Sequence, residues 1–336
     1  MTIDIHAHYV PPQLIDAVKT RGAEIGVRLA VSPGATAPAL QFDYGFKVRP
    51  FFPRLVEPAA ARKTWLAEKR IDHQILGTWP DIFAYGLPPH ACQAWHRMLN
   101  DSLAAWCADH AGTFSWIASV PMPGAEAAAA ELERAVGAGA IGVIIASNVE
   151  GTNLGEVALD AFWAKAQALD VPILIHPVMS TPAPRAAKFA LAQIAQYTFD
   201  TTLGVGSLIF AGVLDRYPGL TVILSHGGGA FPYLMGRFDL MHERMDRAAQ
   251  GDVAARPPSG YGAQLVYDSI VHAPKPLRFL ADSVGLDRIV LGTDYSFPPA
   301  DLDPLESLRA AGFSAADIET VAEVNPRRYF KRLDGR

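Results

Sequence analysis

Two kinds of hydrophobic pattern alternate along this chain. Short runs rich in isoleucine, valine and leucine carry almost no charge, as expected for strands of a sheet that is covered on both faces. Between them lie longer segments in which apolar residues recur every three or four positions, which is the spacing of an amphipathic helix. The predicted strands span residues 3–8, 74–79, 116–120, 142–146, 173–176, 222–226, 265–270 and 289–293. The predicted helices include residues 89–108, 125–136, 159–169, 203–216, 232–247 and 276–283.

Strands that alternate with helices in this way favour an α/β fold, a closed (β/α)8 barrel of the TIM type. The alternative is a doubly wound open sheet, but no glycine-rich dinucleotide fingerprint follows the first strand. Residues 21–58 are too long for one loop and contain short alternating runs, so we predict a small inserted β-hairpin or cap there. Residues 301–336 are expected to form two or three closing helices, so that residues 1–336 make a single barrel domain.

Composition and charge exclude several classes of protein. Half of the 336 residues are hydrophobic, which is enough for a large core, and 29 basic against 34 acidic residues give a net charge of −5. No dense basic tract is present, so nucleic acid is not an expected partner. The longest uncharged run, residues 217–236, contains glycines and prolines and does not predict a membrane helix. Asp4 and His6 stand where a signal peptide would become apolar, so we expect a cytoplasmic protein.

Histidine and aspartate side chains stand at the ends of four predicted strands. His6 and His8 are two residues apart on the first strand, so both point to the same side, which in a barrel is the interior. His176, His226 and Asp294 follow the apolar runs of the fifth, sixth and eighth strands. Each alone is compatible with a capping or turn residue. Together they place five candidate ligands or bases at the carboxyl ends of strands, where barrel enzymes build their active sites.

These residue types predict a metal site. Neutral imidazole and carboxylate suit a borderline divalent ion such as Zn²⁺, although other divalent metals share these ligands. Such an ion activates water, a nearby histidine can take the proton of that water, and a carboxylate can pass protons to a substrate. The fourth strand ends in Ala146-Ser147-Asn148, without a lysine or carboxylate that could bridge two ions. We therefore expect one Zn²⁺ per subunit.

The order of these residues resembles a known family. A His-x-His pair, then histidines on strands five and six and an aspartate on strand eight, is similar to the amidohydrolase superfamily. The segments around these residues are similar to aminocarboxymuconate semialdehyde decarboxylase and its relatives, and the likeness runs from residue 3 to about residue 330. The segments are Asp4-Ile5-His6-Ala7-His8, His176-Pro177, His226-Gly227-Gly228-Gly229-Ala230-Phe231-Pro232, Gly236-Arg237 and Gly292-Thr293-Asp294-Tyr295-Ser296-Phe297-Pro298.

The resemblance implies a zinc-dependent decarboxylase that needs no oxygen, usually a homodimer on a distorted barrel. Carried over by position, it assigns the metal to His6, His8, His176 and Asp294. It also makes His226 the base beside the metal, so that the catalytic roles fall on His226 and Asp294.

The resemblance further implies two cations that bind a substrate carboxylate. One is Arg237, which would reach into the site of the neighbouring subunit, and the other is Lys47, where the family has an arginine. Lysine keeps the charge but loses the two-pronged guanidinium. Arg49, two residues further on, is a candidate substitute, and the alternative for both is the exposed edge of a hairpin. Phe297 is interpreted either as a wall of the substrate pocket or as a packing residue.

Two further departures from the family concern the substrate and leave the metal site intact. Ser296 stands where the family has a proline, and residues 182–197 lack the tryptophan that the family has after the strand-five histidine. The main prediction is decarboxylation of a small unsaturated or aromatic carboxylic acid. A hydrolase or hydratase acting on a lactone, an amide or an activated double bond would use the same scaffold. A non-catalytic zinc protein is disfavoured, because structural zinc sites are closed by four protein ligands, often cysteines.

Overall fold

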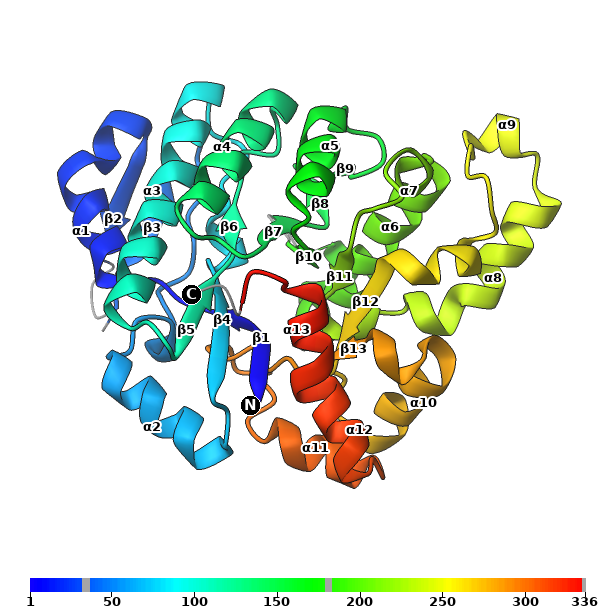
Figure 1. Cartoon of the computed structure of the whole chain (residues 1–336). Coiled ribbons are helices and arrows are strands. Elements are labelled where there is room, and N and C mark those ends of the chain that lie inside the picture. The colour runs from blue at the N-terminus through cyan, green and yellow to red at the C-terminus, as the bar shows by residue number, and fades with distance from the viewer. Residues whose placement is uncertain (32–36, 179–182, 334–336) are drawn as a thin grey trace.

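The apolar runs form a ring of parallel strands in the computed structural model, which describes residues 1–31, 37–178 and 183–333 (Figure 1). One part of the ring consists of β1 (Ile3–His8), β4 (His73–Gly77) and β5 (Phe114–Trp116). After one residue the last of these strands continues as β6 (Ala118–Ser119), where the second part begins. That part runs on through β7 (Val143–Ala146), β10 (Ile173–His176), β11 (Val222–Leu224), β12 (Leu265–Asp268) and β13 (Ile289–Val290).

Backbone hydrogen bonds close the ring between its last and first strands. The Ile5 amide donates to the Leu291 carbonyl at 2.9 Å, and the Asp294 amide donates to the His6 carbonyl at 2.8 Å. A doubly wound sheet would leave these two edges unpaired. The predicted (β/α)8 barrel is therefore confirmed, with most strands ending one to three residues before the predicted boundary.

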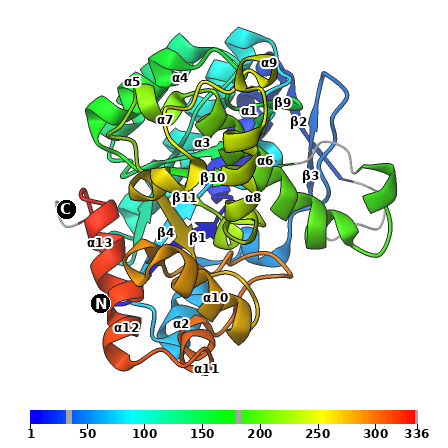
Figure 2. The same cartoon turned by 90° about the vertical axis from the view of Figure 1, so that its right-hand side faces the viewer.

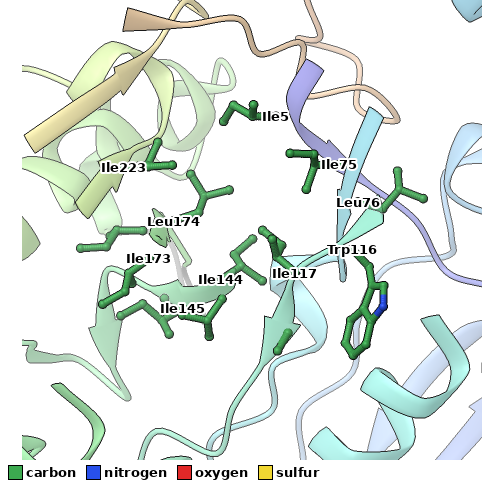
Figure 3. Packing of buried hydrophobic residues seen from close by; sticks show 14 of the residues in the cluster. Ile5, Ile75, Leu76, Trp116, Ile117, Ile144, Ile145, Ile173, Leu174 and Ile223 are labelled. Atoms are coloured by element: carbon green, nitrogen blue, oxygen red, sulfur yellow. The ribbon is translucent and has the colours of Figure 1, made fainter. Parts of the chain in front are cut away.

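Most of the strands are apolar because both of their faces are buried, whereas β1 carries Asp4, His6 and His8 among its six residues. Side chains from neighbouring strands pack against one another in Figure 3, and Ile5, Ile144 and Ile223 are completely buried. Burial of one such side chain contributes about 1.5–3 kcal/mol. This packing fixes the positions of the carboxyl ends of the strands, where the candidate site residues lie.

Helices cover the outside of the barrel. Those that precede the C-terminal segment are α1 (Pro12–Arg21), α2 (Ala59–Lys69), α3 (Pro89–Asp109), α4 (Ala125–Gly137), α5 (Asp160–Leu169), α6 (Tyr197–Phe210), α7 (Val213–Arg216), α8 (Phe231–Arg244), α9 (Arg247–Gln250) and α10 (Pro274–Val284). The single helix predicted over residues 203–216 is wrong in its bounds. It begins earlier, at Tyr197, and is divided at Gly212, whose φ of 67° ends a right-handed helix. None of the helices in the described ranges is long and apolar enough to cross a membrane.

The two additions to the plain barrel repeat are present. An antiparallel hairpin of β2 (Val27–Ala30) and β3 (Ala39–Phe42) follows α1, and Figure 2 shows it protruding from one side of the barrel. A second short hairpin pairs β8 (Asn148–Val149) with β9 (Thr152–Asn153). The C-terminal segment forms α11 (Pro304–Ala310), α12 (Ala315–Glu319) and α13 (Asn325–Tyr329). Residues 32–36 of the predicted insert and residues 334–336 of the predicted tail lie outside the described residues.

Candidate metal and active site

Five side chains converge at the carboxyl ends of the barrel strands. The Nε2 atoms of His6 and His8 lie 3.1 Å apart. Asp294 Oδ1 lies 3.2 Å from His8 Nε2, and Asp294 Oδ2 lies 3.5 Å from His226 Nε2. Donor atoms of His6, His176, His226 and Asp294 all lie within 4.8 Å of one another. The structure thus brings all five side chains together, but the group with mutually close donor atoms contains His226, the predicted base, and not His8, a predicted ligand.

Three of the four histidines are held through the ring nitrogen that faces away from the cluster. The partners of their Nδ1 atoms are Asp268 Oδ2 for His6 at 2.7 Å, the Thr78 carbonyl for His8 at 3.0 Å and the Pro177 carbonyl for His176 at 2.8 Å. A proton on Nδ1 leaves the lone pair of Nε2 directed at the cluster. Within the described ranges no such partner holds Nδ1 of His226, so this ring differs from the other three.

Two buried atoms of the cluster lack hydrogen-bond partners among the described residues, namely His176 Nε2 and Asp294 Oδ1. The contact between His8 and Asp294 Oδ1 is close but is not oriented as a hydrogen bond. A buried polar group left in this state costs about 1–3 kcal/mol. A cation among these donors would satisfy both atoms, so the residues fit a divalent metal ion.

The protonation states also suit metal binding. Burial lowers the pKa of His176 to about 3 and also lowers the pKa of His8, so both rings are neutral near pH 7. Burial alone would raise the pKa of Asp294, but its close contacts with the imidazoles of His176, His226 and His8 outweigh burial and hold that pKa well below its usual value. Burial would lower the pKa of His6, but the hydrogen bond with Asp268 and the charge of Asp294 outweigh it, so that this pKa is raised instead. The cluster therefore offers two neutral imidazoles, those of His8 and His176, and one ionised carboxylate, while His6 holds a proton more readily than a free imidazole.

The backbone at the candidate base and at the carboxylate is held in an uncommon conformation. His226 has a φ of 54° and Asp294 a φ of 55°, both in the left-handed region. Such a residue costs of order 1–3 kcal/mol, and residues of this kind cluster at functional sites. The Asp268 carboxylate accepts a hydrogen bond from the His226 amide at 2.9 Å, while the His6 carbonyl accepts one from the Asp294 amide. These bonds hold the two strained residues in place.

Sequence reasoning missed Asp268, the last residue of β12. Its fully buried carboxylate holds the His6 ring and accepts hydrogen bonds from the amides of His226 and Gly227 at 2.9 and 2.8 Å. One side chain therefore orients both a candidate ligand and the candidate base. The available signal was its position, because Asp268 closes an apolar strand in the same way as the residues that were singled out.

Ser296 takes part in the scaffold around His8. Its hydroxyl donates to the His8 carbonyl at 2.7 Å and accepts a hydrogen bond from Arg62 Nη2 at 2.7 Å. Arg62 is completely buried and also donates to the His8 carbonyl, at 3.0 Å. A proline at position 296 would have no side-chain hydroxyl for either bond, so the departure from the family has a structural role next to the metal cluster.

The predicted substrate-binding residues differ in their distance from the cluster. The Phe297 ring lies 5.0 Å from the His8 ring, between centroids, so Phe297 borders the site directly. Arg49 is exposed, and its Nη2 lies 3.1 Å from Asp81 Oδ2. Lys47 is exposed on the inserted hairpin, where its backbone pairs with Gln41.

Arg237 lies on α8 and lines a surface cavity of about 420 Å³ that contains no residue of the metal cluster. It makes no ion pair in the part of the chain that the structure describes, so the pairing with Asp239 or Glu243 that would make it an ordinary surface arginine is not formed. Most of the cavity lining is apolar and comes from α6 and α8. The apolar residues are Phe199, Leu203, Phe210, Leu234, Phe238, Met241 and Met245.

Comparison with known protein families agrees with this geometry. Residues 3–332 match the family model described as Amidohydrolase. The chain belongs to the amidohydrolase family. The predicted resemblance is thereby confirmed.

Relatives of this amidohydrolase include enzymes of two reaction types. It is 33% identical over 244 residues to a 2-amino-3-carboxymuconate-6-semialdehyde decarboxylase of Dictyostelium discoideum, covering 71% of this chain and 67% of the relative. It is 26% identical to a 2-keto-4-carboxy-3-hexenedioate hydratase of a Sphingobium species, covering 100% and 98%. Its fold is similar to that of a dihydroxybenzoic acid decarboxylase of Polaromonas with bound manganese and the inhibitor 2-nitroresorcinol. For that structure the TM-score is 0.77 and the identity 23%, covering 98% and 96% of the two chains.

Proposed function

We propose that this amidohydrolase is a metal-dependent, non-oxidative decarboxylase of a small unsaturated or aromatic carboxylic acid, with Zn²⁺ as its metal. The observation that carries the proposal is the convergence of four imidazoles and one carboxylate, with His176 Nε2 and Asp294 Oδ1 buried and without hydrogen-bond partners in the described part of the chain. The decarboxylase among its sequence relatives supports this class of reaction. Because these ligands also suit Mn²⁺, the two metals have to be compared directly.

The proposed metal ligands are His6, His8, His176 and Asp294. Histidines that bind metals generally donate their other ring N–H to an acceptor, as the three anchored rings do here. When bound there, the ion would supply positive charge that attracts substrate oxygens and stabilises negative charge as CO₂ leaves.

His226 is the proposed proton carrier. Its side chain is 14% exposed, and its Nε2 lies 3.5 Å from Asp294 Oδ2, so the pair can exchange a proton and can reach a substrate. Decarboxylation breaks the bond between a substrate carbon and its carboxylate. CO₂ leaves without the bonding electron pair, and that pair takes up a proton. This proton comes from water, and it is delivered to the carbon by His226, or by Asp294 after Asp294 has taken it up from His226.

Four side chains are proposed to bind the substrate. Arg49 and Lys47 offer positive charge to substrate oxygens from the inserted segment, and Phe297 offers a ring face beside His8. The fourth is Arg237, acting from a neighbouring subunit. The apolar cavity that Arg237 lines suits burial against a second copy of the chain, so we include a homodimer in the proposal.

Hydration of an activated double bond is the second candidate function. It is favoured by one specific finding, the similarity over the whole chain to a hydratase. The same cluster would then direct water onto a carbon–carbon double bond, and the carboxylate of the substrate would stay in place.

The product distinguishes these functions. Protein loaded with Zn²⁺ or Mn²⁺ is incubated with a panel of carboxylated muconates, hydroxybenzoates and unsaturated diacids, and CO₂ release is measured together with the mass of the product. The expected product is lighter than its substrate by the mass of one CO₂, with an equal amount of CO₂ released. A gain of water without CO₂ in every productive reaction would replace the decarboxylase by the hydratase.

A further inference from the structure

Asp81 is a carboxylate outside the metal cluster that the proposed mechanism does not use. It lies just beyond β4, and its side chain is 15% exposed. Burial raises its pKa, the nearby Arg49 opposes this shift, and the Asp294 carboxylate adds to it.

The hydrogen bonding of Asp81 is incomplete in comparison with the other buried carboxylates near the site. Asp4 accepts hydrogen bonds from Gln74 and from two groups of Thr293, and Asp268 is bound by a ring and by three amides. Asp81 has Arg49 Nη2 as its partner among the described residues, through Oδ2. An ionised carboxylate has room for about four hydrogen bonds, so Asp81 Oδ1 can accept one from a bound molecule.

A row of aromatic rings connects the metal cluster with Arg49 and Asp81. Phe297 lies 5.0 Å from the His8 ring and 5.7 Å from the Phe52 ring, between centroids. The Arg49 guanidinium lies over the other end of this row, 5.2 Å from the Phe52 centroid. Phe52 and Phe297 are only partly buried, so both present surface to a bound molecule. The arrangement suits a flat substrate with one end at the cluster and the other at Arg49.

We propose that Asp81 accepts a hydrogen bond from a hydroxyl group that the substrate carries at the end away from the metal cluster, while Arg49 donates to the oxygen of that hydroxyl. A hydroxyl is the simplest group that satisfies both residues, because it donates once and accepts at the same oxygen. A second carboxylate there would be repelled by Asp81, and a methoxy group would have no proton to donate. Asp81 thus selects the substrate class, and this inference rests on the proposed function of the site.

The test measures binding rather than turnover. Calorimetric Kd values are compared for matched pairs of salicylates that carry either a hydroxyl or a methoxy group at ring position 3, 4 or 5, with metal-loaded wild-type protein and the Asp81→Ala variant. The ratio of the two Kd values in a pair is the readout. Removing a negative charge alters the affinity for both anions alike, so this general effect cancels in the ratio.

We expect the wild-type protein to favour the hydroxyl member of at least one pair by about tenfold or more, since a hydrogen bond to a charged group is worth this much. The ratio should fall to near one in Asp81→Ala. Asp81→Asn, which keeps the size of the side chain, serves as the second variant, and its ratio should fall as well. Asp43→Ala is the matched control, because it removes the exposed partner of another arginine of the inserted segment, Arg28, and it should keep the wild-type ratio.

A preference that persists in both Asp81 variants, or that is absent from the wild type, would overturn the role of Asp81 and leave the decarboxylase proposal standing. If the metal-loaded wild-type protein binds no member of any pair, the role proposed for Asp81 is wrong, whereas the decarboxylase proposal is decided separately by CO₂ release from the muconates and unsaturated diacids of the panel.

Discussion

A hydrogen bond at Nδ1 distinguishes three of the histidine rings of the cluster from the fourth. An anchored Nδ1 fixes the tautomer of His6, His8 and His176 before any ligand arrives. The ring of His226 has no such anchor within the described ranges, and its pair with Asp294 gives it a partner for proton exchange. A ligand must keep a lone pair directed at the metal, whereas a base must gain and lose a proton, so the two roles make opposite demands on a ring.

A pair of variants separates these roles. His176→Ala should lose most of its bound metal, whereas His226→Asn should keep the metal and lose turnover by about 10²–10⁴-fold, the usual contribution of a general acid–base group. Metal content by mass spectrometry and CO₂ release are measured on the same preparations. Equal loss of metal in both variants would contradict the assignment.

Asp268 provides a second prediction at this scale. Asp268→Asn should weaken metal binding by about 10–100-fold, because residues that orient a ligand typically contribute this much. Asp252→Asn is a matched control, since Asp252 pairs with His242 at 2.6 Å away from the cluster. Competition with a chelating dye measures both affinities. An Asp268 variant with the metal affinity of the control would show that His6 needs no anchor.

Among the elements, the turn between β11 and α8 is the most constrained. Gly229 has a φ of 63°, and a Cβ there would lie 2.0 Å from the Thr198 carbonyl oxygen, so the first turn of α6 prevents any side chain. The run of three glycines therefore permits close packing of a strand-to-helix turn.

Gly229→Ala should lower the free energy of unfolding by several kcal/mol or prevent folding, because both the backbone conformation and the space are unsuitable. Gly236→Ala is the matched control. Gly236 lies within α8, and a Cβ added there would have no heavy atom of another part of the chain within 4 Å. Alanine at this position should stabilise the helix by up to about 1 kcal/mol. Urea unfolding curves of both variants provide the measurement, and equal midpoints would disprove the packing argument.

Much of the fold and of the cluster is predictable because barrel strands carry a strong local signal. An apolar run buried on both faces has few alternatives, and polar residues at its carboxyl end meet those of the other strands by symmetry. The break at Gly212 was not predictable, because a glycine inside a helical pattern does not by itself indicate a positive φ. The contact between Arg49 and Asp81 was not predictable for another reason, since it depends on how the inserted segment lies against the barrel.

At the scale of the whole molecule, we propose that two copies of the chain form a dimer. Arg237 has no ion-pair partner in the described part of its own chain and lines a largely apolar cavity that lacks the metal ligands. A cation that has no ion-pair partner and lies beside an apolar surface suits a subunit interface, at which it can contact the site of the neighbouring subunit.

Mixing two inactive proteins tests this arrangement. Arg237→Ala and His176→Ala subunits are combined after unfolding and refolding together. Each mixed dimer would have one site with both defects and one with neither, so up to half of the activity of a wild-type dimer should return in the mixed species. Mixed dimers that form, as shown by differently tagged subunits, and remain inactive would exclude action of Arg237 across the interface.

The hydrogen bonds that close the barrel join its first strand to its last, and this has a consequence for the synthesis of the protein. His6 and His8 leave the ribosome long before Asp294, which follows only when nearly all of the barrel has been made. A growing chain therefore presents an incomplete set of donors for most of its synthesis, and a chain that terminates before Asp294 lacks the carboxylate that is proposed to hold the metal. If the cluster binds a metal ion as proposed, binding would be a late event, linked to the completion of the last strand, and would stabilise only chains that contain Asp294.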